Sequence, residues 1–265
     1  MLKQRFLSAM LFVPFLLITM YLGGLVWPAV VAGVIIVAIK EYTAMVQGKD
    51  IYQPFWLMII ITFIFVAIAY YDANMLGVAI ALALGSATCW VLFNKAPFPS
   101  FTMAVCGMLY VSWSFSHLIA IRQLPDGFWL ILLTFLIAWA TDTGAYAFGM
   151  LFGKHKIMPA ISPKKSWEGA IGGLVTCVAV IALYNYFILD YPMAAILVIA
   201  FLCSVLGQIG DFLESWLKRW AGVKDAGKFL PGHGGILDRF DSIILIAPFI
   251  YYAYEIILCI GRGGI

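Results

Sequence analysis

The sequence predicts an all-α fold, a polytopic integral membrane protein with about nine transmembrane helices and a cytoplasmic N-terminus. Of the 265 residues, 64% are hydrophobic and only 11% are charged, and the mean hydropathy is +1.01. Apolar runs long enough to cross a bilayer recur along the chain, and most lysines and arginines fall on alternate connections between them. A soluble globular domain carries about a quarter charged residues, so the composition excludes an ordinary soluble enzyme.

The apolar runs are expected to be helices, because lipid offers the backbone polar groups no partner outside the chain itself. The first run follows a short basic start, and no small-residue cleavage site precedes the next run, so we interpret it as a retained span rather than a signal peptide. The expected spans cover residues 6–24, 25–39, 55–70, 75–93, 100–121, 127–150, 168–189, 192–217 and 237–260. Residues 1–126 are expected to form a lipid-facing scaffold, and residues 127–265 to carry a catalytic site on the cytoplasmic side.

The positive charges set the expected orientation. With the N-terminus in the cytoplasm, 14 of the 16 lysines and arginines fall on the cytoplasmic side, and only Arg122 and Arg262 fall outside. This asymmetry is the one that the positive-inside rule describes. Four cations of the first half are interpreted as orientation signals only: Lys3, Arg5, Lys40 and Lys49.

Polar residues gather in the second half of the chain, in three clusters. The first is "WATDTGAYAFGMLFGKHK", in which Asp142 lies inside an expected span. A carboxylate within a membrane helix costs about 2.5–3.5 kcal/mol, so it ordinarily faces a partner, an ion or a water-filled cavity. We interpret Asp142 as functional; the alternative is that it neutralises a lysine of a neighbouring span.

The second cluster is "ISPKKSWEGAIGG", in which Lys164 and Lys165 project together and Ser166 to Gly169 resembles the start of a helix. Lysines beside a helix N-terminus form an anion site, because free backbone N–H groups and the helix dipole add to the ammonium charges. Taken alone, the pair is explained better as lysines that set orientation or contact anionic headgroups.

The third cluster places carboxylates on two helices. "GQIGDFLESWLKR" puts Asp211, Glu214, Ser215 and Lys218 on one helical face, and "DRFDS" puts Asp238 and Asp241 on the first turn of the last helix. So many carboxylates at a membrane surface repel one another unless a cation lies among them, and hard oxygen ligands favour Mg²⁺. Salt bridges to Lys218 and Arg239 are the alternative.

The connection between these two helices predicts a polyphosphate site. In "LPGHGG", Gly232, Gly234 and Gly235 permit positive φ and close approach of the backbone to a ligand, and His233 lies between them. No nucleotide-binding glycine motif of soluble proteins occurs in the chain. Five cations flank the connection: Lys218, Arg219, Lys224, Lys228 and Arg239.

The segment from Ser215 to Ser242 resembles the C-terminal signature of the bacterial phosphatidate cytidylyltransferases, or CDP-diacylglycerol synthases. "TDTGAYAFG", "GKHK" and "SPKKSWEG" are also similar to segments of this family, so the specific resemblance covers roughly Asp142 to Ser242. The matching signature positions are Ser215, Leu217, Lys218, Arg219, Lys224, Asp225, Gly227, Leu230, Pro231, Gly232, His233, Gly234, Gly235, Asp238, Arg239, Asp241 and Ser242.

The resemblance implies the reaction of CTP with phosphatidate to give CDP-diacylglycerol and pyrophosphate. It further implies a multi-pass protein of the bacterial cytoplasmic (inner) membrane, a divalent metal and a homodimer; no nucleic-acid partner is expected. The residues favour Mg²⁺ as that metal, and whether a second, monovalent cation assists it is left open. The residues alone had indicated a membrane, a cytoplasmic polyphosphate and Mg²⁺. The cytidine base and the lipid acceptor come from the resemblance alone.

The resulting site hypothesis assigns each residue a role. Mg²⁺ is held by Asp211 and Asp238, with Asp241 nearby, and Asp142 joins a second cation site or lines the cavity. The expected catalytic residues are Asp211, Asp238, Asp241, Lys218 and Arg239. The expected substrate-binding residues are Lys164, Lys165, Arg219, Lys224, Asp225, Lys228, Gly232, His233, Gly234, Gly235 and Ser215.

Three other functions compete with this hypothesis. A CDP-alcohol phosphotransferase would need an acidic motif that is not found here, whereas a polyprenol-type kinase would share the need for CTP and Mg²⁺. A secondary transporter could line an ion path with Asp142, Asp211 and Glu214. Transporters usually show interrupted helices in both halves, but the polar residues of this chain lie in one half.

Overall fold

The computed structural model of the chain describes residues 2–227, 229 and 234–261, with side chains described for residues 10, 12–227, 229 and 234–254. The described residues are mainly helical, and an isolated bridge pairs Lys156 with Ser166. The all-α prediction is therefore confirmed. The chain divides into two compact units, one of residues 1–125 and 218–240 and one of residues 126–217 and 241–265.

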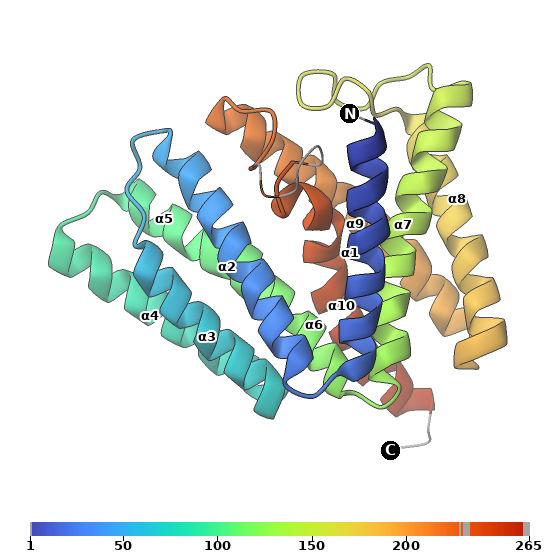
Figure 1. Cartoon of the computed structure of the whole chain (residues 1–265), viewed down its shortest axis with the longest axis horizontal. Coiled ribbons are helices and arrows are strands. Elements are labelled where there is room, and N and C mark those ends of the chain that lie inside the picture. The colour runs from blue at the N-terminus through green and yellow to red at the C-terminus, as the bar shows by residue number, and fades with distance from the viewer. Residues whose placement is uncertain (1, 228, 230–233, 262–265) are drawn as a thin grey trace. The chain divides into compact units, whose positions relative to one another are not determined.

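Nine continuous helical segments run through the described part of the chain (Figure 1). Six are long and apolar enough to cross a membrane, and Phe12–Leu22 and Phe55–Tyr71 are shorter apolar helices. The segments are α1 (Leu2–Leu22), α2 (Val26–Gln47), α3 (Phe55–Tyr71), η1 with α4 (Ala73–Met75, Leu76–Asn94), α5 with η2 and α6 (Phe98–Gly107, Met108–Trp113, Ser114–Gln123), α7 (Gly127–Phe152), α8 with η3 (Trp167–Tyr184, Asn185–Leu189), α9 (Met193–Ala221) and α10 (Leu237–Gly261).

Large apolar side chains cover much of the surface. Tyr71 is 82% exposed, Phe93 87% and Phe187 74%. Extended apolar surface of this kind is rare on soluble proteins, but it is the expected surface of helices whose solvent is lipid. The chain is a multi-pass membrane protein.

In the first unit, α2 packs against α3 and α6 around a buried apolar core. Two polar contacts tie these helices together: the Trp27 indole donates to the carbonyl oxygen of Leu118 at 2.9 Å, and the hydroxyls of Thr62 and Ser112 lie 2.7 Å apart. α3 and α4 lie side by side in the same unit.

One helix boundary differs from the expected span in a way that concerns the site. α2 was expected to end at residue 39, before the charged pair Lys40 and Glu41, but it continues to Gln47. The extension buries Tyr42, Met45 and Val46. Burial of these apolar groups continues the helix past the charges, and it carries Glu41 into the interior of the first unit.

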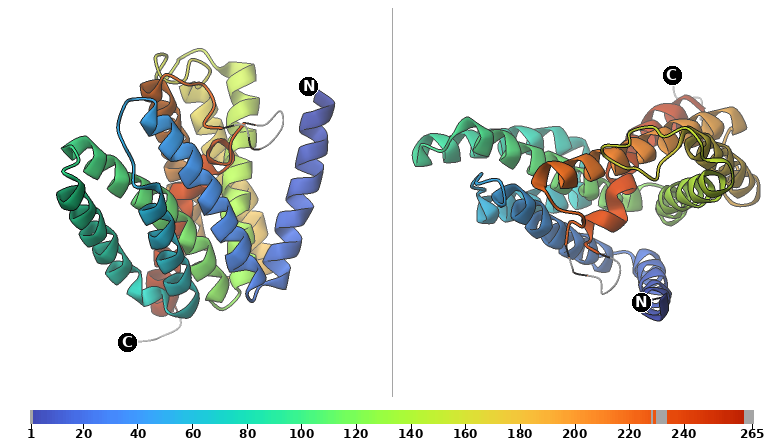
Figure 2. Two further views of the ribbon diagram at one scale, coloured as in Figure 1. Left: turned by 60° about the vertical axis from the view of Figure 1, so that its left-hand side comes forward. Right: turned by 90° about the horizontal axis from the view of Figure 1, so that it is seen from above.

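In the second unit, α7 and α8 lie side by side along much of their length (Figure 2). Glycines on α8 permit this close approach. A Cβ atom on Gly169 would lie 2.8 Å from the carbonyl oxygen of Ala145, and one on Gly173 would lie 2.6 Å from that of Thr141. Small residues let helix backbones pack closely in membranes, where no hydrophobic force drives helices together.

Candidate active site

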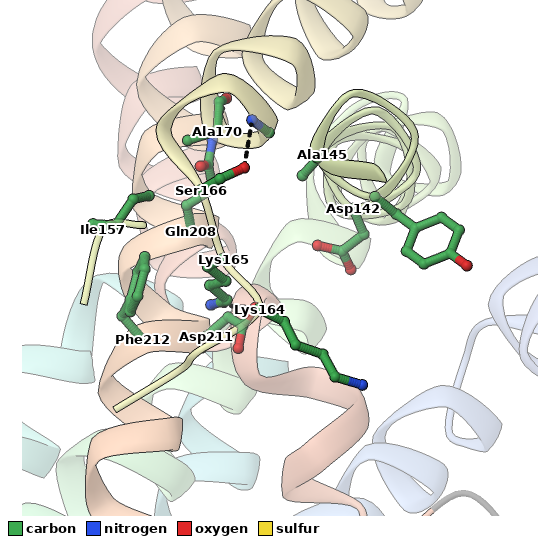
Figure 3. A pocket seen from close by; sticks show the side chains of 13 residues that line it. Asp142, Ala145, Ile157, Lys164, Lys165, Ser166, Ala170, Gln208, Asp211 and Phe212 are labelled. Carbon is green, nitrogen blue, oxygen red and sulfur yellow. Dashed lines mark hydrogen bonds and ion pairs between the residues drawn. The ribbon is translucent and has the colours of Figure 1, made fainter. Parts of the chain in front are cut away.

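A cavity of about 280 Å³ opens in the second unit, among α7, the connection from α7 to α8, the start of α8, and α9 (Figure 3). Its lining is mixed: apolar groups such as Ile157 and Phe212 lie beside Gln208 and four charged residues. The charged residues are Asp142, Lys164, Lys165 and Asp211. The structure therefore brings together members of all three sequence clusters.

An ion pair joins the second and third clusters within this cavity. The Lys165 amine lies 2.5 Å from Oδ2 of Asp211, and both side chains are roughly three-quarters buried, at 25% and 29% exposure. The same amine lies 4.0 Å from the centre of the Phe212 ring, a cation–π contact. Figure 3 shows the Asp142 carboxylate extending from α7 toward the cavity, while the Lys164 amine points away from that of Lys165.

Glu168 of α8 binds the beginning of the connection that carries both lysines. The Glu168 carboxylate accepts hydrogen bonds from the backbone N–H groups of Lys154 and His155 at 3.2 Å, and it lies 2.6 Å from Nδ1 of His155. Ser166 caps α8 by accepting from the N–H of Gly169 at 3.2 Å. The helix start expected at Ser166 is therefore confirmed, and it fixes the lysines at one end of the cavity.

A second group of carboxylates lies where α9 meets α10 in the same unit. A Cβ atom on Gly210 would lie 2.5 Å from the carbonyl oxygen of Asp241, so the glycine lets the two backbones meet. The charges of Asp211, Glu214 and Asp142 act on the Asp241 carboxylate. Oδ1 of Asp241 accepts from the N–H of Ser242 at 2.6 Å, and Ser215 donates to Oδ1 of Asp211 at 3.5 Å.

This donor set fits Mg²⁺ in its chemistry. The donors are carboxylate oxygens, and Mg²⁺ is commonly bound through one or two carboxylates together with substrate phosphates. Within the described residues, no three acidic, histidine or cysteine side chains already form a cluster that could hold a metal. Asp211 and Asp241 are the best candidates, since they lie on adjoining helices and the unit gathers further negative charge around them.

The first unit holds the rest of the described signature residues. Lys218 and Asp238 form a largely buried ion pair, with 2.6 Å between Nζ and Oδ1 and side-chain exposures of 12% and 8%. Oδ2 of Asp238 accepts from the N–H groups of Ala226 at 2.9 Å and Gly235 at 2.8 Å. Both oxygens of Asp238 therefore have partners within the chain: the Lys218 amine and the backbone N–H groups of Ala226 and Gly235.

Glu41 is the residue of this region that the sequence reasoning missed. Its carboxylate accepts from the backbone N–H groups of Ile236 and Leu237, at 3.0 Å each, where α10 begins. The sequence did carry a signal, because Glu41 is an acid in an apolar segment next to Lys40. That signal was lost once the span was expected to end at residue 39.

The remaining predicted residues are placed as follows. Gly234 adopts the positive φ expected of the loop, at 86°. Arg219 donates to the carbonyl oxygen of Val223 at 3.2 Å. The exposed members are Arg219, Lys224, Asp225 and Arg239. Lys228, Gly232 and His233 lie outside the described residues.

The division into units also divides the predicted metal ligands. Asp142, Asp211 and Asp241 belong to the second unit, whereas Asp238 belongs to the first. The hypothesis that Asp211 and Asp238 share one ion therefore stays a prediction.

Comparisons with known proteins give a consistent result. A family model described as the cytidylyltransferase family matches residues 3–257. A Staphylococcus haemolyticus protein named phosphatidate cytidylyltransferase is 45% identical over 157 residues, which cover 58% of this chain and 59% of the relative. A protein of the same name from Staphylococcus aureus (strain COL) is 44% identical over 157 residues, with the same coverage. The chain thus spans about 59% of the length of these relatives.

Proposed function

The chain belongs to the cytidylyltransferase family, and on that premise we propose that it is a phosphatidate cytidylyltransferase. It transfers the cytidylyl group of CTP to phosphatidate and releases pyrophosphate, which makes CDP-diacylglycerol for phospholipid biosynthesis. The relatives that carry this name are similar to the chain over a region of 157 residues. The bacterial cytoplasmic (inner) membrane is the proposed location, and a homodimer the proposed assembly.

The contact between Lys165 and Asp211 is the observation that carries the proposal. It places an amine suited to a phosphate beside a carboxylate suited to Mg²⁺, in a cavity of a membrane protein. A nucleotidyl transfer to a lipid phosphate needs both groups at one site, and it needs them where a lipid headgroup can arrive. An amphipathic cavity among apolar helices meets these requirements.

The proposed reaction is an in-line displacement at phosphorus. A phosphate oxygen of phosphatidate forms a bond to the α-phosphorus of CTP, and the bond from that phosphorus to the oxygen that bridges to the β-phosphorus breaks. The electron pair of the broken bond leaves with pyrophosphate. No general base is needed, since a phosphomonoester is already ionised at neutral pH.

The chain's own residues bind and orient the two phosphates. Lys164 and Lys165 contact the phosphates of CTP or the headgroup of phosphatidate, and the ion pair with Asp211 holds Lys165 ready in the cavity. The signature segment supplies further cations for phosphate: Lys218, Arg219, Lys224, Lys228 and Arg239. Such positioning and charge stabilisation account for most of the catalysis in phosphoryl-group chemistry.

Mg²⁺ is proposed as the metal, with Asp211 and Asp241 as its protein ligands. When bound, it neutralises the negative charge of the triphosphate and of the leaving pyrophosphate. Asp142 is the proposed ligand of a second, monovalent cation. Asp238 already holds Lys218 and two backbone N–H groups, which favours an organising role over direct contact with a metal.

Pyrophosphate release tests the proposed function. Purified protein in detergent with Mg²⁺ should release pyrophosphate when CTP and phosphatidate are both present, and not when either is left out. Omission of Mg²⁺ is the control for the metal. Release of CDP together with a phosphorylated lipid would favour the kinase. If the protein leaves CTP intact but is active in a transport assay, the transporter would be favoured.

A further inference from the structure

Glu41 lies on α2, nearly two hundred residues before the signature segment in the chain, yet its carboxylate contacts that segment directly. Oε1 accepts from the N–H of Ile236 and Oε2 from the N–H of Leu237, each at 3.0 Å. These are backbone donors at the start of α10, which have no partner within the helix. One side chain therefore satisfies two donors at the beginning of the helix that carries Asp238.

The fit around this carboxylate is tight. Glu41 is only 7% exposed. A Cβ atom on Gly235 would lie 2.5 Å from Oε2 of Glu41, and one on Gly227 would also collide with the carboxylate. Neither glycine is among the described residues with positive φ, so close approach to Glu41, and not backbone conformation, accounts for glycine at both positions.

Asp238 binds the backbone next to the two donors of Glu41. It accepts from the N–H groups of Ala226 and Gly235, while Glu41 accepts from those of the next two residues, Ile236 and Leu237. Consecutive N–H groups of one segment are thus divided between two carboxylates. Lys218 is the ion-pair partner of Asp238, and Glu41 is stabilised by its two backbone donors and the positive end of the α10 dipole.

Burial of an ionised carboxylate is expensive, so an acid that served only to fill space on α2 would be less stable there than an apolar residue of similar size. The contacts of Glu41 indicate a role beyond filling space on α2. Two hydrogen bonds of equal length to adjacent N–H groups fix both the position and the rotation of the first turn of α10. That turn carries Asp238 and Arg239.

We propose that Glu41 is a positioning residue for the signature segment. It holds the start of α10, and through it Asp238 and Arg239, in the arrangement that the transfer reaction requires. The inference rests on the proposed function for its link to catalysis, and on the structure for its contacts.

The first test needs no activity. In wild-type protein, hydrogen exchange should find the amides of Ile236 and Leu237 protected. In the Glu41→Gln variant, which retains only one good acceptor, these amides should exchange about 10- to 100-fold faster, because hydrogen bonds to a charged group are lost. Thr43→Val is the matched control: Thr43 is also buried on α2 but donates to Lys40 within the helix, so its loss should leave both amides unchanged.

The second test measures initial rates with CTP and phosphatidate varied separately. Glu41→Gln should lower kcat/KM for CTP by about 10- to 100-fold, with part of the loss in a higher KM for CTP, as expected when binding groups are misplaced. A merely structural role would reduce the amount of active protein, which lowers the apparent kcat and leaves both KM values unchanged. Glu41→Asp, which keeps the charge, should recover part of the loss.

Each outcome has a distinct meaning. Faster exchange at residues 236 and 237 together with a higher KM for CTP supports the proposal. Unprotected amides in the wild type would overturn it even if no variant folds, and so would Glu41→Gln kinetics that match the wild type. If the wild type makes no CDP-diacylglycerol, the proposed function fails, and the exchange data still decide whether Glu41 holds α10.

Discussion

Asp211 takes part in more of the proposed chemistry than any other single residue. Its Oδ2 pairs with the Lys165 amine, its Oδ1 accepts from Ser215, and its charge acts on Asp241. These contacts tie an amine for phosphate to the carboxylates proposed for Mg²⁺. In the proposed function, Asp211 would therefore link substrate binding and metal binding within the second unit.

Asp211→Asn should abolish this link and leave the shape of the side chain almost unchanged. We expect turnover to fall by about 100-fold or more, as in other sites where one electrostatic contact is removed. Steady-state pyrophosphate release measures the effect, with protein yield recorded alongside.

Asp190→Asn is the matched control for that change. Asp190 is exposed and adopts a positive φ of 56°, a conformation that asparagine tolerates. It should retain wild-type turnover. Normal turnover in Asp211→Asn would remove Asp211 from the site.

Residue types and spacing were enough to select Asp142, Lys164, Lys165 and Asp211, which do line one cavity. They could not predict that Lys165 pairs with Asp211, because the two lie on different elements and many partners were available. Glu41 is conspicuous in the sequence as an acid in an apolar segment, but its partners are not. It accepts from two backbone N–H groups, and residue types do not identify which backbone donors a side chain will meet.

Among the helices, the start of α8 fixes the connection that carries the two lysines. Ser166 is 3% exposed, its hydroxyl accepts from the N–H of Gly169, and Glu168 holds the preceding connection through His155. The Ser166 cap and the Glu168 carboxylate both belong to the start of α8. The helix start thus serves both stability and the geometry of the cavity.

Ser166→Ala should remove the cap and lower the free energy of unfolding by about 1 kcal/mol. A lower midpoint of thermal unfolding in detergent would register the loss. Ser86→Ala is the control, since Ser86 donates to Ala83 within α4 and caps no helix end. Equal midpoints for the two variants would show that the cap contributes nothing.

The helices themselves were largely predictable, because long apolar runs in lipid have few alternatives to a helix. Their ends were less so. The expected span ended at residue 39, whereas the helix continues to Gln47 and buries Tyr42 and Met45. The π-helical turn at Met108–Trp113 had no signal in the sequence that distinguished it from α-helix.

For the chain as a whole, composition and the C-terminal signature were sufficient to predict the fold class and the family. A multi-pass helical protein and membership of the cytidylyltransferase family are both confirmed. The cytoplasmic position of the N-terminus stays a prediction from the distribution of Lys and Arg. So does a single metal site built from Asp211 and Asp238, which belong to different units.

The proposed function requires that the chain transfer a cytidylyl group, and not a phosphoryl group, to a lipid. The most direct measurement uses CTP with radioactive phosphorus at either the α or the γ position, incubated with purified protein, Mg²⁺ and phosphatidate. We expect the α label to enter the lipid phase while the γ label stays in aqueous pyrophosphate. Entry of the γ label into lipid, with the α label left in CDP, would rule out cytidylyl transfer.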